Sequence, residues 1–182
     1  MRKNSVLIAG QKTFTCKGVF AISMPFIFAA ALFASCAGGG AKEAPPFLSQ
    51  NYVFTADYVI SETEGSLRFK KSGIESCELT FLSPDTMAGM NLVKDGGTAT
   101  IEFKEMSYEL DVSELTRDNP LKALCELLSE SNTPSSVTTD KNTGDVKYLY
   151  ENGSYIIAYS GVPKYIEIPA SSISLKITGF ES

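Results

Sequence analysis

The side chains that most often perform catalysis are scarce in this sequence. None of its 182 residues is a histidine, which excludes Ser-His-Asp and Cys-His arrangements and removes the commonest metal ligand and general base. Gly38 to Gly40 are not followed by the Lys-Ser or Lys-Thr of a phosphate loop. The 21 acidic residues could supply a carboxylate pair for glycoside hydrolysis, but their spacing marks no particular pair. We therefore expect no catalytic residue, no cofactor and no enzyme.

One stretch has a weak similarity to a metal-binding loop. In DKNTGD, residues 140–145, Gly144 comes one place too early for a calcium loop. The composition Asp-Lys-Asn-Thr-Gly is typical of a turn. The sequence therefore predicts a hairpin turn here and no metal site.

Cys36 follows a segment organised like a secretory signal peptide. Four basic residues and no acidic residue precede it, and residues 19–34 are uncharged. A membrane-spanning helix is disfavoured, because this run contains Pro25 and falls short of the ~20 residues that cross a bilayer. The ending Phe-Ala-Ser-Cys resembles the lipobox of bacterial lipoproteins, although Phe33 replaces the usual leucine. The resemblance implies that residues 1–35 are a cleaved signal peptide and that Cys36 is lipidated; plain secretion is the alternative.

Charge and composition divide the remaining chain into two parts. Four of the 16 basic residues and none of the 21 acidic residues leave with the signal peptide, so 12 against 21 gives a net charge of −9. Such a chain does not favour nucleic acid or anionic headgroups, and a covalent lipid is the better route to a membrane. Residues 36–50 contain few large apolar residues, which predicts a flexible Gly/Pro linker. Residues 51–182 have the size of one domain.

Beyond residue 50 the apolar residues recur with a period of two. The pattern occurs in YVFTADYVIS, SLRFKK, SCELTFL, TATIEF, YELDV and SISLKITGF, and it indicates strands with one buried face. Turn signals separate the strands, at Lys94–Gly97 and at Asn152-Gly153. Regular short spacing of this kind predicts an antiparallel sheet or barrel.

A single segment, DNPLKALCELLSES, has helical spacing instead. Asn119 is suited to cap the helix and Pro120 to occupy its first position. The apolar stripe of this short helix needs a partner surface, for which the concave face of the sheet is the natural choice. The predicted fold is therefore mainly β with a short α-helix: a curved antiparallel sheet or incomplete β-barrel with a helical plug or lid.

This order of elements resembles that of the LolA/LolB-like lipoprotein carriers, including the membrane-anchored lipoproteins of the LppX and LprG type. The resemblance runs from about residue 52 to 180, through SPDTMAGMNLVKDGGTATIEF, NPLKALCELL and VPKYIEIPASSISLKITGF. It implies an incomplete barrel with helices across its mouth, an apolar cavity for acyl chains, no cofactor and no reaction. The chain departs from the soluble carriers by its lipobox, and from many members by its single helix, which implies a smaller lid.

The residues expected to contact such a ligand are apolar and face the concave side of the sheet, the mouth loop or the helix. They are Phe54, Tyr58, Leu67, Phe69, Leu79, Phe81, Met87, Met90, Leu92, Ile101, Phe103, Leu124 and Leu128. Methionines suit an entrance for varied apolar partners. The alternative interpretation is an ordinary packed core with two loop methionines.

Two cysteines remain in the predicted domain. Cys77 and Cys125 both fall on inward faces, and an exported chain permits a disulfide between them. Without a known distance between their Cα atoms, the sequence favours two separate buried thiols over a disulfide.

Taken together, the sequence predicts a monomeric, extracytoplasmic lipoprotein attached to a bacterial cell membrane through lipidated Cys36. Its expected ligand is a lipid or the acyl chain of a lipoprotein, held in the concave face of the sheet, and its expected role is that of a carrier or chaperone. The alternative is a non-enzymatic lipoprotein with a packed core that binds an envelope protein. Neither interpretation involves nucleic acid.

Overall fold

A computed structural model describes residues 43–182; the predicted signal peptide and Cys36 lie outside the described residues. The strands are β1 (Tyr52–Ile60), β2 (Thr63–Ser72), β3 (Ser76–Phe81), β4 (Asn91–Asp95), β5 (Thr98–Phe103), β6 (Met106–Asp111), β7 (Ser136–Thr139), β8 (Val146–Leu149), β9 (Tyr155–Tyr159), β10 (Val162–Ile168) and β11 (Ile173–Glu181). The helices are α2 (Pro120–Leu127) and the short 3₁₀ turns η2 (Pro46–Ser49), η3 (Val112–Glu114) and η4 (Pro169–Ser171).

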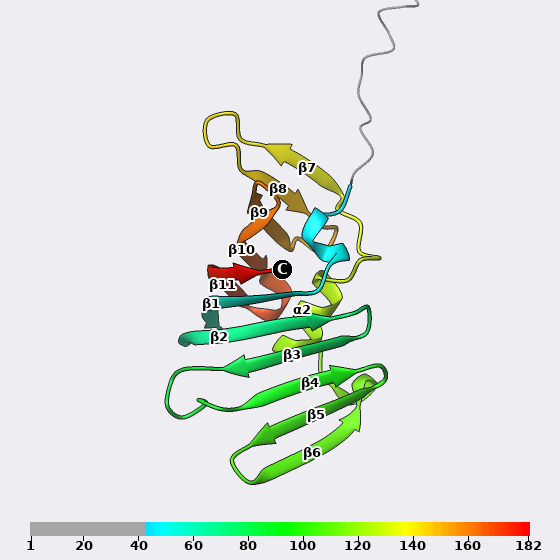
Figure 1. Cartoon of the computed structure of the whole chain (residues 1–182), viewed down its shortest axis with the longest axis vertical. Coiled ribbons are helices and arrows are strands. Elements are labelled where there is room, and N and C mark those ends of the chain that lie inside the picture. Colours follow the sequence, from blue (N-terminus) through cyan, green and yellow to red (C-terminus); the bar gives the residue numbers. More distant parts are fainter. Residues whose placement is uncertain (1–42) are drawn as a thin grey trace, which may run out of the picture. The chain divides into compact units, whose positions relative to one another are not determined.

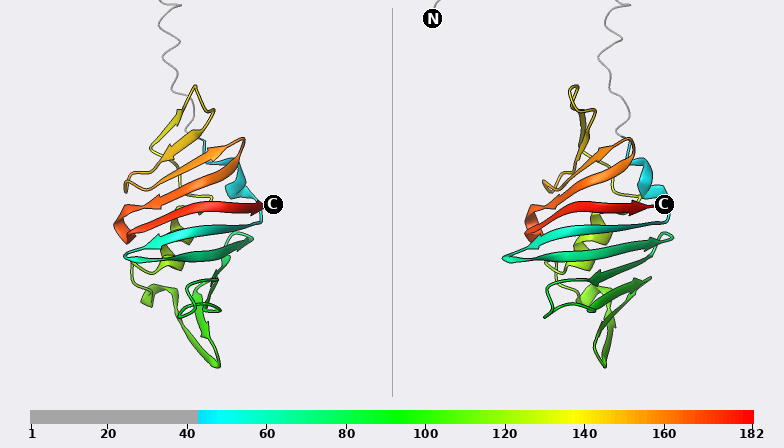
Figure 2. Two further views of the ribbon diagram at one scale, coloured as in Figure 1. Left: turned by 90° about the vertical axis from the view of Figure 1, so that its left-hand side faces the viewer. Right: turned by 60° about the vertical axis from the view of Figure 1, so that its left-hand side comes forward.

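The eleven strands form one antiparallel sheet in the order β6-β5-β4-β3-β2-β1-β11-β10-β9-β8-β7 (Figure 1). Each strand pairs with its neighbour in sequence, except that β1 pairs with β11 and the chain crosses over from β6 to β7. The sheet curves without closing (Figure 2), so that β6 and β7 are its two edges. This half-barrel with a helix confirms the predicted fold class.

Cross-strand pairing gathers the alternating apolar residues on the concave face. In the register of the strands, Phe54 lies opposite Phe69, and Phe69 lies opposite Leu79. Leu79 in turn lies opposite Leu92, and Leu92 opposite Ile101. The rings of Phe54 and Phe69 stack with their centroids 5.1 Å apart. The period of two therefore becomes a continuous apolar ladder across five strands.

Helix α2 lies on this concave face, in the crossover between β6 and β7 (Figure 2). Asn119 caps it as predicted: its Oδ1 accepts hydrogen bonds from the Leu121 N–H at 3.0 Å and the Lys122 N–H at 3.3 Å. The apolar stripe of the helix is buried, with Leu121 and Leu124 almost fully inaccessible. Among residues 43–182, no helix has the length and hydropathy required to cross a membrane.

The predicted turns are confirmed. Gly96-Gly97 joins β4 to β5, and Asn152-Gly153 lies between β8 and β9. Residues 140–145 form the hairpin turn between β7 and β8, in which the Asp140 N–H donates to the Asp145 carbonyl oxygen at 2.8 Å. Strand β7 was not predicted, because Ser136–Thr139 is short and mostly polar.

The prediction of a flexible linker over residues 36–50 is wrong for the last residues of that range. Phe47 and Leu48 in η2 are only 3% and 1% exposed. The ring of Phe47 packs edge-on against Tyr52 and Phe180, with centroids 5.4 and 5.9 Å away. Aromatic side chains at the start of β1 and the end of β11 form an apolar surface against which the residues of η2 can pack. Packed structure therefore begins about six residues before the predicted boundary at residue 51.

Candidate ligand-binding site

Most of the residues predicted to contact a ligand lie inside one close-packed core. They are contributed by β1 to β4 and by the helical segment, and each is at most 5% exposed: Phe54, Tyr58, Leu67, Phe69, Leu79, Phe81, Leu92, Leu124 and Leu128. Helix α2 packs mainly against β3 and β4 and places its leucines over them. The concavity beneath α2 is therefore filled by the helix's own side chains.

The other four predicted residues lie around the margin of this core. Met87, Met90 and Ile101 are half-buried and pack against it. Phe103 is half-buried but does not belong to the core cluster; Lys104 Nζ lies 5.0 Å from the centroid of its ring. The structure thus divides the predicted set into a buried part under α2 and a partly open part on β4 and β5.

The partly open part continues onto β6. Ile101 lies opposite Tyr108, and Phe103 lies opposite Met106. Met106 and Tyr108 are 67% and 64% exposed. We call Met90, Ile101, Phe103, Met106 and Tyr108 the open strip, because they carry the apolar ladder beyond the part covered by α2. Met106 and Tyr108 were not among the predicted ligand residues. The alternation Met106-Ser-Tyr108-Glu-Leu110 was the sequence signal that could have placed them on the apolar face.

The predicted mouth loop around Met87 and Met90 corresponds to residues 82–90, between β3 and β4, and is tied to the sheet. The Tyr58 hydroxyl donates to the Ser83 carbonyl oxygen at 3.0 Å and lies 3.8 Å from the Met87 sulfur. The Ser66 N–H donates to Ser83 Oγ at 2.8 Å. Burial raises the pKa of the Tyr58 hydroxyl, which therefore stays protonated and able to donate. This loop buttresses one end of the sheet, and Met87 lies half-buried within it.

Cys77 in β3 and Cys125 in α2 form a disulfide, with their Cα atoms 6.9 Å apart. The favoured interpretation of two separate thiols is therefore wrong. The strand period and the helix period each place one cysteine on the surface that faces the other element, so that docking of α2 brings the sulfurs together. The disulfide fastens α2 to the sheet.

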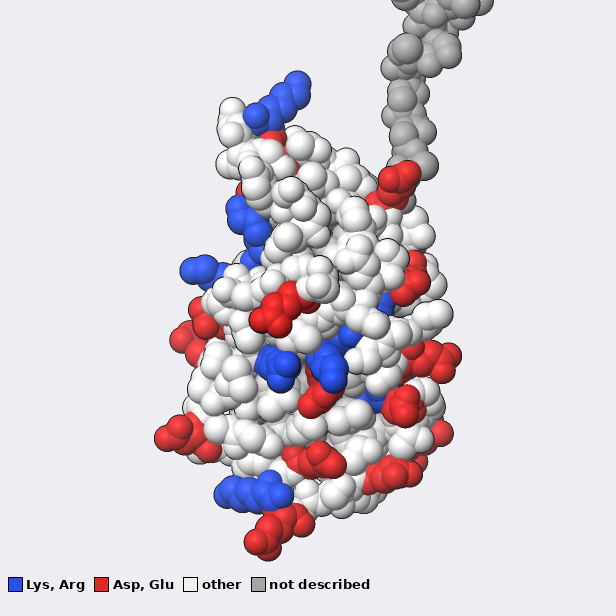
Figure 3. Space-filling view, in the orientation of Figure 1, with Lys and Arg blue, Asp and Glu red and all other residues white. Residues whose placement is uncertain are grey.

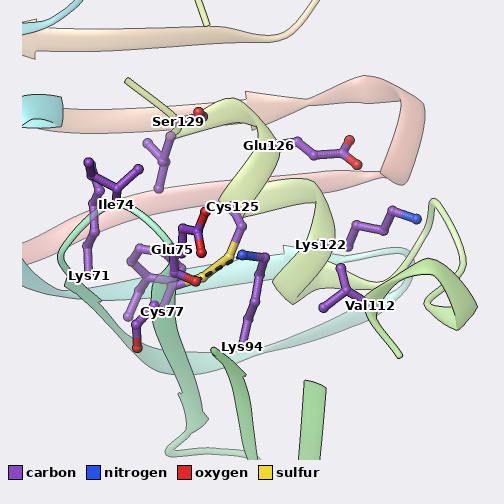
Figure 4. A pocket seen from close by; sticks show the side chains of 13 residues that line it. Lys71, Ile74, Glu75, Cys77, Lys94, Val112, Lys122, Cys125, Glu126 and Ser129 are labelled. Atoms are coloured by element: carbon purple, nitrogen blue, oxygen red, sulfur yellow. Dashed lines mark hydrogen bonds between the residues drawn. A yellow bond between two sulfur atoms is a disulfide. The ribbon is translucent and has the colours of Figure 1, made fainter. Parts of the chain in front are cut away.

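A pocket of about 230 Å³ lies beside the disulfide (Figure 4). Phe69 and Leu128 contribute apolar surface, and three lysines surround it, each held by an acceptor of the protein. Lys94 Nζ donates to the Glu75 carbonyl oxygen at 2.9 Å, and Lys122 Nζ donates to the Leu115 carbonyl oxygen at 2.9 Å. The buried Lys71 donates to the Leu48 carbonyl oxygen and to Glu130.

Two larger and more open hollows are lined mainly by residues outside the predicted set. One, of about 570 Å³, lies between the second half of α2 and η4. The other, of about 550 Å³, lies near the turn between β1 and β2 and includes Tyr58. Within residues 43–182, no group of three or more Cys, Asp or Glu side chains is placed to hold a metal ion.

The domain is thus an open antiparallel half-barrel with a helix on its concave face. Similar solved structures include an uncharacterized conserved protein from Thermus thermophilus, with 12% identity, a TM-score of 0.46, and coverage of 74% of this chain and 79% of that chain. They also include a LolA superfamily protein from Nitrosomonas europaea, with 8% identity, a TM-score of 0.41, and coverage of 77% of this chain and 88% of that chain. The family that the sequence resembles is therefore represented among them. No protein-family model and no curated protein matches the sequence.

Proposed function

We propose that this protein is a lipid-anchored, extracytoplasmic binding protein for an apolar ligand, which is a lipid or the acyl chain of a lipoprotein. It acts as a carrier or chaperone and catalyses no reaction. The open strip is the observation that supports this role most directly. Its exposed members, Met106 and Tyr108, lie on the same face as the buried ladder and continue it to the edge of the sheet.

The open strip has the chemistry required to hold part of an acyl chain. Burial of each CH₂ group contributes ~0.8 kcal/mol, so a contact of about five methylenes gains ~4 kcal/mol before the cost of immobilisation. Methionine adapts its shape to irregular apolar partners, which suits a ligand of variable chain length. A longer chain would also require space under α2, where Phe69, Leu79 and Leu124 are now packed.

Native mass spectrometry on the full chain tests this proposal. The protein is produced in a bacterium, purified from membranes in mild detergent and compared with the M106S/Y108S variant. Both side chains are largely exposed, so the variant keeps its fold. Tyr159→Ser is the matched control, because Tyr159 is 52% exposed on β9, at a distance from the open strip in the sheet order.

We expect the wild type to carry an additional mass that extracts into organic solvent. The double variant should lose at least half of that mass, and Tyr159→Ser should retain it. A wild-type chain that bears only its own anchor, or equal loss in both variants, would contradict the proposal.

A second candidate function, a protein-binding lipoprotein without an internal ligand, is favoured by a different observation. The predicted ligand residues on β1 to β4 and the buried leucines of α2 belong to one close-packed core. If the wild type carries no extractable mass, this second function is the one to pursue.

A further inference from the structure

Strand β6 ends the sheet with one row of backbone groups unpaired. The Val112 N–H donates to the Gly97 carbonyl oxygen at 2.8 Å, and the two residues continue the β5–β6 register. Bonded and non-bonded pairs alternate along an antiparallel ladder. Met106, Tyr108 and Leu110 therefore direct their N–H and C=O groups toward β5. Those of Ser107 and Glu109 point outward, where no strand of the described chain lies.

The side chains of this edge separate into an apolar side and an acidic side. Met106, Tyr108 and Leu110 share the concave face, whereas Glu109 and Asp111 share the opposite face. Neither β5 nor β6 contains a lysine or an arginine. Acidic side chains predominate over this end of the molecule, at the bottom of Figure 3. The Ser113 N–H donates to the Asp111 carboxylate at 2.8 Å, and hydrogen bonding to Ser113 lowers the pKa of that carboxyl group.

Exposed edges are ordinarily protected against pairing by lysines, prolines or bulges. Residues 106–111 contain none of these, and their pairing with β5 is regular. Two β6 strands paired with each other would bring acidic side chains close together, since Glu109 and Asp111 share one face, and like charges across a ladder are destabilising. The acidic face therefore opposes self-pairing, while it leaves the edge available to a strand of opposite charge.

We propose that β6 docks an extended segment of another protein in which apolar residues alternate with Lys or Arg. Added as a twelfth strand, the segment would bond to the outward backbone groups of Ser107 and Glu109. Its apolar residues would cover Met106 and Tyr108, and its basic residues would lie beside Glu109 and Asp111. This inference goes beyond the proposed ligand binding and does not depend on it.

The probe for the test is a fluorescent synthetic peptide of about eight residues in which Val and Lys alternate. Its affinity for the full chain in detergent is measured by fluorescence anisotropy at physiological ionic strength. A second peptide carries the same residues as a Val block followed by a Lys block. Glu109→Pro removes a backbone N–H that points outward. The hydrogen bonds between β6 and β5 are kept. Glu109→Lys reverses the charge without this backbone change, and Glu64→Lys on β2 is its charge-matched control.

We expect Glu109→Pro and Glu109→Lys each to weaken binding of the alternating peptide at least tenfold, and Glu64→Lys to change it less than twofold. The block peptide should bind at least tenfold more weakly than the alternating one. Equal effects of the two lysine variants, or equal binding of the two peptides, would mean general attraction to an acidic chain and would overturn the proposal. A dimer in sedimentation that Glu109→Pro dissociates would identify a second copy as the occupant and would also overturn it. Peptide binding without any lipid mass would leave this inference standing while the proposed carrier function failed.

Discussion

Gly65 in β2 allows the mouth loop to approach the sheet. A Cβ added at this position would lie 2.2 Å from the Ser83 carbonyl oxygen and 2.8 Å from the Tyr58 hydroxyl. We expect Gly65→Ala to displace residues 82–90 and to lower the free energy of unfolding by about 1 to 3 kcal/mol, the range of overpacking in well-packed sites. Urea denaturation followed by circular dichroism measures this change.

Gly97 provides the control for that substitution. A Cβ at Gly97 meets nothing within 4 Å, and its backbone is not in the left-handed region. Gly97→Ala should therefore shift stability by less than about 0.5 kcal/mol, as surface substitutions usually do. Equal losses in the two variants would mean that the close approach at Ser83 has no energetic importance.

Tyr52 buries a hydroxyl that has no hydrogen-bond partner within residues 43–182. Burial, and secondarily the nearby Tyr150, raise the pKa of Tyr52 above its ordinary value of 10.0. In the unfolded chain the hydroxyl ionises above about pH 10, whereas in the folded protein it stays neutral. The unfolded state then binds fewer protons, so stability is complete below pH 10 and declines as the pH rises further.

We therefore expect Tyr52→Phe to lose less stability than the wild type between about pH 9 and pH 11. At neutral pH the variant should be at least as stable as the wild type, because it removes a buried hydroxyl without a hydrogen-bond partner, a group whose burial costs ~1 to 3 kcal/mol. Denaturation curves at neutral pH, at about pH 9 and at about pH 11 test this, with Tyr108→Phe as the exposed control. An identical alkaline decline in Tyr52→Phe and the wild type would rule out this contribution.

At the scale of elements, the disulfide between β3 and α2 holds the helix over the ladder. Cys77 and Cys125 are 48 residues apart in sequence, and the loop-entropy model gives ~4 kcal/mol for a loop of this length. We expect the Cys77→Ala/Cys125→Ala variant to lose about that much stability and to exchange the amide hydrogens of α2 faster. If hydrogen exchange in α2 is unchanged in the double variant, packing of the leucines alone holds the helix.

The elements that were predictable from sequence are those with local causes. The cap of Asn119, the turn at Gly96-Gly97 and the alternation in β1 each depend on neighbours in sequence. The docking of Phe47 depends on Tyr52 and Phe180, which meet only after β1 pairs with β11. The disulfide likewise depends on where the crossover places α2. The same limit applies to the candidate site, because periodicity identified the apolar face but not how much of it α2 covers.

At the scale of the whole molecule, the covalent anchor is the proposed link to the membrane. A mature chain with 12 basic and 21 acidic residues is repelled by anionic headgroups, so attachment should depend on Cys36 and not on salt. The eight Cα-to-Cα steps from Cys36 to Ala44, the first described residue that contacts the core, span at most about 28 Å. Under the proposed anchoring, this segment would be shorter than a linker to residue 50 and would keep the domain near the bilayer.

We expect the full-length wild type to incorporate an alkyne-labelled fatty acid and to remain in the membrane fraction after a high-salt wash. Cys36→Ser should incorporate no label and lose this salt-resistant membrane association, because an acidic chain is repelled by anionic headgroups. Cys16→Ser, within the predicted signal peptide, is the matched control and should keep both the label and the membrane location. Persistent membrane association of Cys36→Ser would show that attachment does not depend on the lipidated cysteine, and the proposal of a lipid-anchored carrier would then have to be abandoned in that form.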